Sequence, residues 1–169
     1  MIRFLSFLLF LLCCHSSMGM AQGKKDMKDY WIDKYLSVSF PLESIRINST
    51  FGSRVDPFTG KHKQHKGLDL RARYEEVLSM FSGYVKGVGY DSGSGKYITM
   101  QYGDYTVSYC HLSEIWVSDN QKVYAGDPIG ISGTTGRSTG PHLHITCRLR
   151  GRLEDPYDLL LYIKETREK

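Results

Sequence analysis

Hydrophobic and polar positions divide the chain into an apolar N-terminal run and a longer region of short alternating segments. Residues 2–12 form the apolar run, with the single base Arg3 near its start. The run is shorter than the about 20 residues that a membrane span needs. Gly19 and Ala21 are small residues at the third and the first position before a possible cleavage site ahead of Gln22. Residues 1–21 are therefore predicted to be a signal peptide, which implies export to the periplasm, the cell envelope or the medium.

A helical pattern follows the predicted signal peptide. Met27, Tyr30, Trp31 and Tyr35 recur at helical spacing within residues 26–36. This pattern predicts a short amphipathic helix that packs on the main domain. We therefore expect an N-terminal segment at residues 22–46 and one domain at residues 47–169.

From Val38 onward the pattern changes to short β-rich segments separated by glycine. Gly103-Asp104 between two such segments predicts a tight hairpin turn. Asp155 is predicted to be the N-cap of a C-terminal helix, with Pro156 at its first position. The predicted strands are Leu78–Tyr90, Tyr97–Tyr102, Tyr105–Cys110, Lys122–Tyr124, Pro128–Ser132 and His142–Leu149. The predicted fold class is mainly β, a single antiparallel β-sheet or sandwich-like domain with short helices at its N- and C-terminal ends.

Charge and composition limit the possible partners. The chain has 22 Lys and Arg residues against 18 Asp and Glu, a formal net charge of +4 at pH 7. Loss of residues 1–21 would remove one base and no acid and would leave +3. This mild basicity is compatible with an anionic cell-wall partner. There is no long basic block or basic-aromatic alternation, so we expect no nucleic-acid binding, and the oligomeric state stays open.

The cysteines fall into two pairs. Cys13 and Cys14 lie in the predicted signal peptide, so the alternatives to cleavage are an uncleaved anchor or a lipoprotein acylated at one of them. Cys110 and Cys147 would remain in the mature chain. Their odd offsets from the nearest histidines predict that both thiols face away from the imidazoles. They are interpreted as small buried hydrophobes or as one disulfide, and not as metal ligands.

Four of the five histidines beyond residue 21 occur in three compact motifs. His142 and His144 are two residues apart on a predicted strand, so their imidazoles share one face. The first and last residues of the segment 65–69, His-Lys-Gly-Leu-Asp, share a face if that segment is extended. The third motif, residues 109–113, places a histidine at the end of a β-like run. His62 lies in a polar stretch and is interpreted as a surface residue.

These side chains have the chemistry of a catalytic zinc site. Such a site typically has three protein ligands and an open position for water. The four histidines and Asp69 give five candidates for three ligand positions, so two histidines would be left over. The imidazoles of these two histidines, placed beside the ion, could take up and return protons. No His-Glu-x-x-His motif is present. Each motif alone has a structural alternative: Asp69 as a turn residue, His111 as a strand-end histidine, and His142 and His144 as surface residues of a half-buried strand.

Taken together, the motifs resemble those of a known family. His65-x-x-x-Asp69, His111-Leu112-Ser113 and Gly140-Pro141-His142-Leu143-His144 are similar, in this order, to the motifs of the lysostaphin-like (LytM-type) zinc endopeptidases that cleave peptidoglycan. The similarity extends to Phe51-Gly52-x-Arg54, Pro57-x-Thr59-Gly60 and the loop at residues 133–140. It covers about residues 47–160.

The resemblance implies a function and a set of roles. His65, Asp69 and His144 would bind one Zn²⁺ ion per chain, and His111 and His142 would be the catalytic pair. The fold would form an open groove of antiparallel strands walled by loops. Gly133, Thr134, Ser138 and Thr139 would line that groove, and peptidoglycan peptides would be the substrate.

The sequence departs from the family in three places. Thr146 replaces a usual acidic residue, Lys96-Tyr97 replaces a common asparagine, and residues 71–77 lack the usual glycine-rich turn. Two other functions remain as alternatives. One is a non-catalytic module of the same fold that binds peptidoglycan or regulates an amidase. The other is a two-metal phosphoesterase, which would require more carboxylates near the histidines.

Overall fold

A computed structural model describes residues 36–168. The predicted signal peptide and nearly all of the predicted helix at residues 26–36 lie outside the described residues. The described chain forms thirteen strands followed by one helix. Their bounds are β1 Ile47–Ser49, β2 Gly52–Val55, β3 His62–His65, β4 Leu68–Arg71, β5 Glu76–Leu78, β6 Gly83–Asp91, β7 Gly95–Tyr102, β8 Tyr105–Leu112, β9 Glu114–Ile115, β10 Lys122–Val123, β11 Pro128–Ile131, β12 His142–Leu149, β13 Arg152–Glu154 and α2 Tyr157–Arg167.

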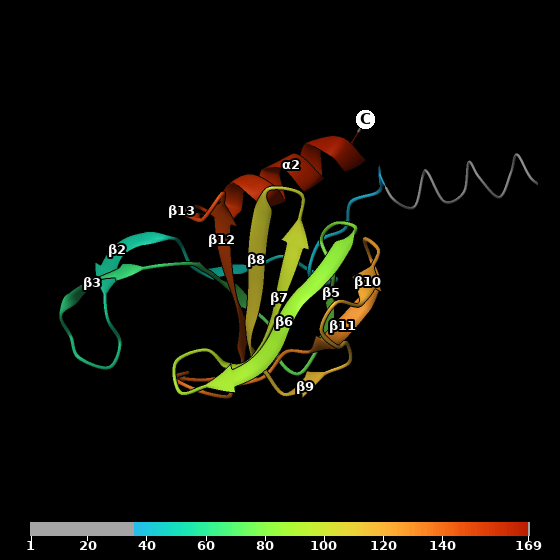
Figure 1. The fold of residues 1–169 in the computed structure, drawn as a ribbon. Helices are drawn as coiled ribbons and strands as arrows, with labels where there is room; N and C mark the ends of the chain where they lie inside the picture. The colour runs from blue at the N-terminus through green and yellow to red at the C-terminus, as the bar shows by residue number, and fades with distance from the viewer. Residues whose placement is uncertain (1–35, 169) are drawn as a thin grey trace, which may run out of the picture. The chain divides into compact units, whose positions relative to one another are not determined.

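An eight-stranded antiparallel sheet dominates the described chain (Figure 1). Its order is β1-β4-β12-β8-β7-β6-β10, and β13 pairs with the free part of β12. A smaller sheet has the order β5-β11-β9, and β2 and β3 form a separate hairpin that extends away from the main sheet. The prediction of a mainly β, antiparallel domain with a helix at its C-terminal end is confirmed.

The two faces of the main sheet have different roles, and β12 shows why. Leu143, Ile145 and Cys147 are buried, whereas His142 and His144 on the alternate positions are only partly buried. The buried side chains join a core that also contains side chains of β4, β7, β8 and α2, among them Leu68, Leu70, Ile98, Met100, Val107, Tyr109, Leu159, Leu160 and Ile163. The period of two along β12 therefore leaves the opposite face available for polar side chains.

Several predicted boundaries differ from the structure. The predicted strand Leu78–Tyr90 is two strands, because β5 ends at Leu78 in the small sheet and β6 begins at Gly83 in the main one. The intervening chain turns, and Ser79 Oγ donates a hydrogen bond to the carbonyl of Phe81 at 2.8 Å. Strands β1 to β4, β9 and β13, each of two to four residues, were not predicted.

The C-terminal helix begins one residue later than the N-cap prediction. Pro156 occupies the N-cap position of α2, and its side chain makes no capping hydrogen bond. Asp155 still satisfies a free donor of the first turn, because its Oδ1 accepts a hydrogen bond from the Tyr157 N–H at 2.9 Å. Within residues 36–168, no helix has both the length and the hydropathy that crossing a membrane requires.

Candidate metal centre and catalytic cleft

A cleft of about 570 Å³ lies on the polar face of the main sheet. Side chains of β7, β8 and β12 form its floor. The β2–β3 hairpin, the turn after β6 and the loop before β12 contribute its walls. The lining residues include Arg54, Asp56, Lys63, His65, Lys66, Asp69, Thr99, Ser108, Cys110, His111, Arg137, Ser138, Thr139, His142, His144, Thr146 and Arg148.

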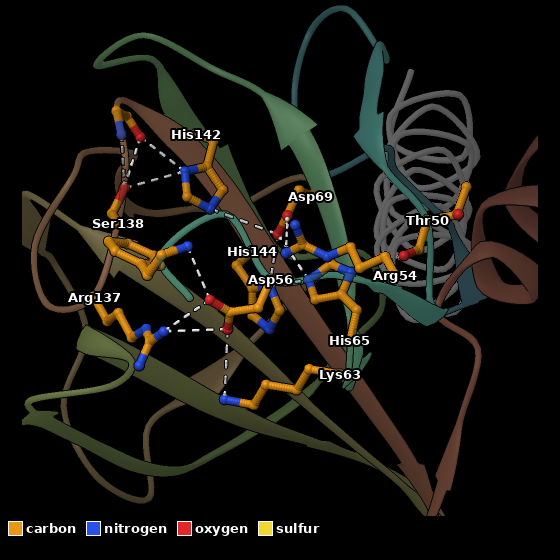
Figure 2. Close-up of polar contacts among 12 residues, drawn as sticks. Thr50, Arg54, Asp56, Lys63, His65, Asp69, Arg137, Ser138, His142 and His144 are labelled. Carbon is orange, nitrogen blue, oxygen red and sulfur yellow. Dashed lines mark hydrogen bonds and ion pairs between the residues drawn. The ribbon is translucent and has the colours of Figure 1, made fainter. Parts of the chain in front are cut away.

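Three potential ligands meet in this cleft (Figure 2). His65 ends β3, Asp69 lies on β4, and His144 lies on β12, where it pairs in register with Asp69. His144 Nδ1 is 2.6 Å from Asp69 Oδ1 and 3.2 Å from His65 Nε2, and Asp69 Oδ1 is 3.2 Å from His65 Nε2. One ligand atom from each residue therefore lies within 4.8 Å of the other two. Among the described residues, this is the group with the chemistry and spacing of a metal site.

The surroundings of the three residues fix which atoms face the common point. His65 Nδ1 lies 2.7 Å from the Thr50 carbonyl oxygen, which can only accept, so Nδ1 carries the proton and Nε2 is left for a metal. Arg54 Nη2 lies 3.3 Å from Asp69 Oδ2, which leaves Oδ1 directed at the two imidazoles. Two imidazoles and a carboxylate with an open side are a recurrent ligand set for catalytic zinc, so these residues fit the ion.

His111 and His142 lie beside the three potential ligands His65, Asp69 and His144, which form the ligand group. The His111 ring centroid is 4.7 Å from that of His142 and 5.7 Å from that of His144. His111 Nδ1 is 2.8 Å from the Thr135 carbonyl oxygen, and His142 Nδ1 is 2.8 Å from the Gly140 carbonyl oxygen. Each Nδ1 therefore donates, and each neutral ring keeps Nε2 free to accept a proton. His142 Nε2 lies 3.6 Å from Asp69 Oδ1, beside the ligand group.

The site also controls the charge of its members. Burial alone would raise the pKa of Asp69, but the interactions with the neighbouring His144 and His65 imidazoles outweigh it and hold that pKa well below its usual range. Burial lowers the pKa of His111 to about 4, although the hydrogen bond to the Thr135 carbonyl acts in the opposite direction. At neutral pH the carboxylate is therefore ionised and the His111 imidazole is neutral.

The prediction for the two cysteines is wrong for one of them. Cys110 pairs in register with His144 across β8 and β12 and lines the cleft, whereas Cys147 is in the core on the other face. His111 has φ of +63°, and this left-handed residue breaks the alternation at the end of β8. Both Cys110 and His111 consequently reach the cleft. The two thiols are free and lie on opposite faces of the sheet, and neither belongs to the ligand group found among the described residues.

The proposed groove residues divide between two environments. Ser138 and Thr139 line the cleft, but Gly133 and Thr134 are not among its lining residues. The Gly133 carbonyl accepts a hydrogen bond from the His142 N–H at 3.1 Å, so Gly133 holds the start of β12. Thr134 is exposed, and its hydroxyl donates to Ser138 Oγ at 3.1 Å. His62 is exposed at the start of β3, as the sequence predicted.

Sequence reasoning missed an ion pair that joins two walls of the cleft. Arg137 Nη2 lies 3.0 Å from Asp56 Oδ1 and 3.1 Å from Asp56 Oδ2, and Lys63 Nζ lies 3.8 Å from Asp56 Oδ2 (Figure 2). The Arg137 guanidinium also stacks over the Phe58 ring at 4.4 Å. The tip of the β2–β3 hairpin is thus fastened to the loop before β12. The motif that begins next to Asp56, at Pro57, and the loop that carries Arg137 were recognised in the sequence, but the contact between Asp56 and Arg137 was not.

Comparison with known proteins agrees with this geometry. Residues 63–156 match the model of peptidase family M23. This match covers more than half of the chain. The chain belongs to peptidase family M23. The matched region includes all five residues of the ligand and histidine groups described above, and the resemblance predicted from the motifs is confirmed.

Members of this M23 family with similar sequences and structures are known. Peptidoglycan DD-endopeptidase ShyA of Vibrio cholerae is 39% identical over 117 residues, which are 67% of this chain and 27% of ShyA. A zinc-containing peptidase from Vibrio cholerae has a TM-score of 0.65 and 33% identity, over 70% of this chain and 39% of that one. The catalytic domain of lysostaphin from Staphylococcus simulans has a TM-score of 0.63 and 29% identity, over 69% of this chain and 92% of that one. The chain spans only about a quarter to a third of the length of the curated relatives it matches.

Proposed function

We propose that this protein is an exported zinc-dependent endopeptidase that hydrolyses peptide bonds in peptidoglycan stem peptides or cross-bridges. The observation that carries the proposal is the convergence of His65, Asp69 and His144 beside two histidines whose Nε2 atoms are free to accept protons. The family membership and the printed activity of relatives such as ShyA support the choice of substrate.

The residues divide into two roles in this proposal. His65 Nε2, Asp69 Oδ1 and His144 Nδ1 would hold one Zn²⁺ ion, which when bound supplies Lewis-acid polarisation of the scissile carbonyl and activation of a water molecule. His111 and His142 would take up a proton at Nε2 and return it to the departing amine. Their Nδ1–H bonds to the Thr135 and Gly140 carbonyls keep each ring in the orientation and tautomer that this role needs.

Export is the part of the proposal that rests on sequence alone. The apolar run at residues 2–12 and the small residues at 19–21 support cleavage after Ala21. N-terminal sequencing of protein purified from the envelope fraction should therefore start at Gln22. Recovery of Met1, or of a chain acylated at Cys13 or Cys14, would contradict cleavage at this position.

One experiment tests the enzymatic proposal against its rivals. Purified protein should contain about one zinc per chain by elemental analysis. When incubated with isolated peptidoglycan, it should release muropeptides whose masses correspond to hydrolysed peptide bonds. Zinc without new muropeptides would favour a non-catalytic binding module. Release of inorganic phosphate from phosphoesters, with two metals per chain, would favour a phosphoesterase.

A further inference from the structure

The floor of the cleft continues along β12 beyond the metal centre. His142, His144, Thr146 and Arg148 occupy alternate positions of this strand, and all four line the cleft. Alternate residues of a strand share one face. With a rise of about 3.3 Å per residue, the Arg148 backbone lies roughly 13 Å from that of His144. The backbone that carries the Arg148 cation is therefore held at a set distance from the ligand group, along the floor on which a substrate would lie.

The floor between the ligand group and Arg148 carries hydroxyl groups and no charge. Thr146 pairs in register with Ser108 of β8, and Ser108 pairs with Thr99 of β7. The Thr99 and Ser108 hydroxyls are hydrogen-bonded to each other at 2.9 Å. Arg148 itself pairs with Thr106. The positive charge of Arg148 is thus not offset by any of its neighbours on this face of β8.

Most other cations of the cleft already have carboxylate partners. Arg54 is paired with Asp69, and Lys63 and Arg137 are paired with Asp56. Within residues 36–168, no carboxylate lies within ion-pair distance of Arg148. Its Nη1 donates to the neutral carbonyl of Gly151 at 3.2 Å, which leaves most of its five N–H donors available.

The backbone position of Arg148 is also better defined than that of Lys66, the other cation that lines the cleft without an ion pair among residues 36–168. Lys66 lines the cleft without an ion pair among the described residues, but it lies in the turn between β3 and β4. Arg148 lies within β12, which is hydrogen-bonded on one side to β8 and on the other to β13. A backbone held on both sides presents its side chain from a fixed point.

From this arrangement, we propose that Arg148 binds a carboxylate of the peptide substrate and makes the cleft selective for acidic peptides. A guanidinium matches the planar geometry of a carboxylate and can donate two parallel hydrogen bonds to it. An extended peptide advances about 3.3–3.6 Å per residue, so a carboxylate about four residues from the scissile bond would reach Arg148. The inference rests on the proposed function, because it assumes that a peptide lies in this cleft.

The test compares two forms of one substrate with matched variants. The substrates are cross-linked muropeptides and the same muropeptides with their carboxylates converted to amides. The variants are Arg148→Gln, Arg148→Lys and the control Arg152→Gln. Arg152 is exposed and pairs in register with Leu149, so it projects on the opposite face from Arg148 while its replacement removes the same charge. Circular dichroism and zinc stoichiometry establish that each variant is folded.

Wild-type protein should have a KM about fivefold to tenfold lower for the carboxylate form than for the amide form. Arg148→Gln should abolish this difference by raising KM for the carboxylate form alone, with kcat unchanged. Arg148→Lys should retain part of the difference, and Arg152→Gln all of it. Equal KM values for both substrate forms in the wild type, or an equal effect of Arg152→Gln, would overturn the inference.

A binding measurement separates this inference from the enzymatic proposal. Calorimetric titration of muropeptides into zinc-loaded His111→Ala, with and without Arg148→Gln, measures affinity without turnover. The carboxylate form should bind fivefold to tenfold more weakly when Arg148 is replaced. If wild-type protein cleaves neither substrate, the proposed function fails, and the affinities alone decide the role of Arg148. Equal affinities would overturn it.

Discussion

Gly67 lies directly against the imidazole of His144. A methyl group added at Gly67 would lie 2.7 Å from both His144 Cε1 and Nε2, and still closer to the Ile145 carbonyl oxygen. Atoms of a normal side chain do not approach others this closely, so the β12 backbone or the His144 ring would have to move. The glycine between His65 and Asp69 is therefore required by a residue of a distant strand.

We expect Gly67→Ala to weaken zinc binding by displacing His144. Changes that misorient a metal ligand typically reduce affinity by about 10- to 100-fold. Competition with a chromogenic chelator measures this affinity. Gly87→Ala is the matched control, since a methyl group at Gly87 meets nothing within 4 Å. Wild-type affinity in Gly67→Ala would show that the ring does not need its observed place.

The four histidines of the cleft should fall into two classes when mutated. His144→Ala removes a ligand, so zinc content should collapse together with activity. His111→Ala and His142→Ala leave the ligand group intact, so zinc should stay while turnover falls by about 10²- to 10⁴-fold. Elemental analysis of the folded variants measures the first effect and muropeptide release the second. If His142→Ala lost zinc and His144→Ala kept it, the roles along β12 would be reversed.

The side chains of this site could be predicted from the sequence only where the backbone alternates regularly. His142 and His144 could be placed on one face because buried and partly buried positions alternate along β12 from His142 to Cys147. Cys110 was misplaced because His111 adopts φ of +63°, which no periodicity of side chains reveals. The carbonyls of Thr50, Thr135 and Gly140 that set the histidine tautomers could not be predicted, because every residue type supplies a carbonyl.

The fold was predictable in class but not in its local interruptions. The sequence pattern predicts one strand at Leu78–Tyr90, but the chain passes there from β5 in the small sheet to β6 in the main sheet. Here buried groups determine the structure: the Tyr109 hydroxyl accepts a hydrogen bond from the Met80 N–H at 3.1 Å. A contact between residues 29 positions apart is not encoded in a local pattern. The short strands near the β2–β3 hairpin depend in the same way on partners distant in sequence.

Arg54→Met should weaken zinc binding through Asp69. Without the contact between Arg54 Nη2 and Asp69 Oδ2 at 3.3 Å, the carboxylate loses the partner that directs Oδ1 at the imidazoles. We expect about a tenfold loss of zinc affinity. Loss of the Arg54 positive charge would by itself raise zinc affinity, because it removes repulsion between two cations. Solvent screens this repulsion, however, because Arg54 is partly exposed. Chelator competition decides between the two effects, with exposed Arg46→Met as the control, and tighter binding would contradict the positioning role.

Tyr109→Phe should destabilise the fold without affecting the metal centre. Tyr109 is fully buried on the core face, and its hydroxyl bonds to both the Met80 N–H and the Tyr102 hydroxyl. Loss of a buried partner costs about 1–3 kcal/mol. Urea unfolding should show this loss at an unchanged m-value, and zinc affinity should stay at its wild-type value. The exposed Tyr157→Phe should show neither change, and an unaltered midpoint in Tyr109→Phe would refute the prediction.

The Asp56–Arg137 ion pair predicts a pH-dependent stability. Burial alone would raise the pKa of Asp56, but hydrogen bonds from the Phe58 and Thr59 N–H groups, together with Arg137, hold it below its usual range. A depressed folded-state pKa stabilises the fold above the unfolded value of about 3.9, and this stabilisation is lost as pH falls through the folded value. Metal-free Asp56→Asn should therefore be less stable than wild type at pH 7. Urea unfolding should show the difference shrinking toward pH 3, and growth of the difference in acid would contradict this assignment.

The ligand group has a further consequence, which concerns the unfolded chain. Asp69 and His144 are 75 residues apart in sequence. An ion that stays bound to both residues when the chain unfolds would act as a cross-link and close a loop of that length, which lowers the conformational entropy of the denatured state. For covalent cross-links this entropic contribution is on the order of 4 kcal/mol at such loop lengths. An ion that is released on unfolding instead stabilises the native state by mass action, and this protects the chain from proteolysis. If the protein binds zinc as proposed, removal of zinc should therefore lower the stability of the fold as well as the activity.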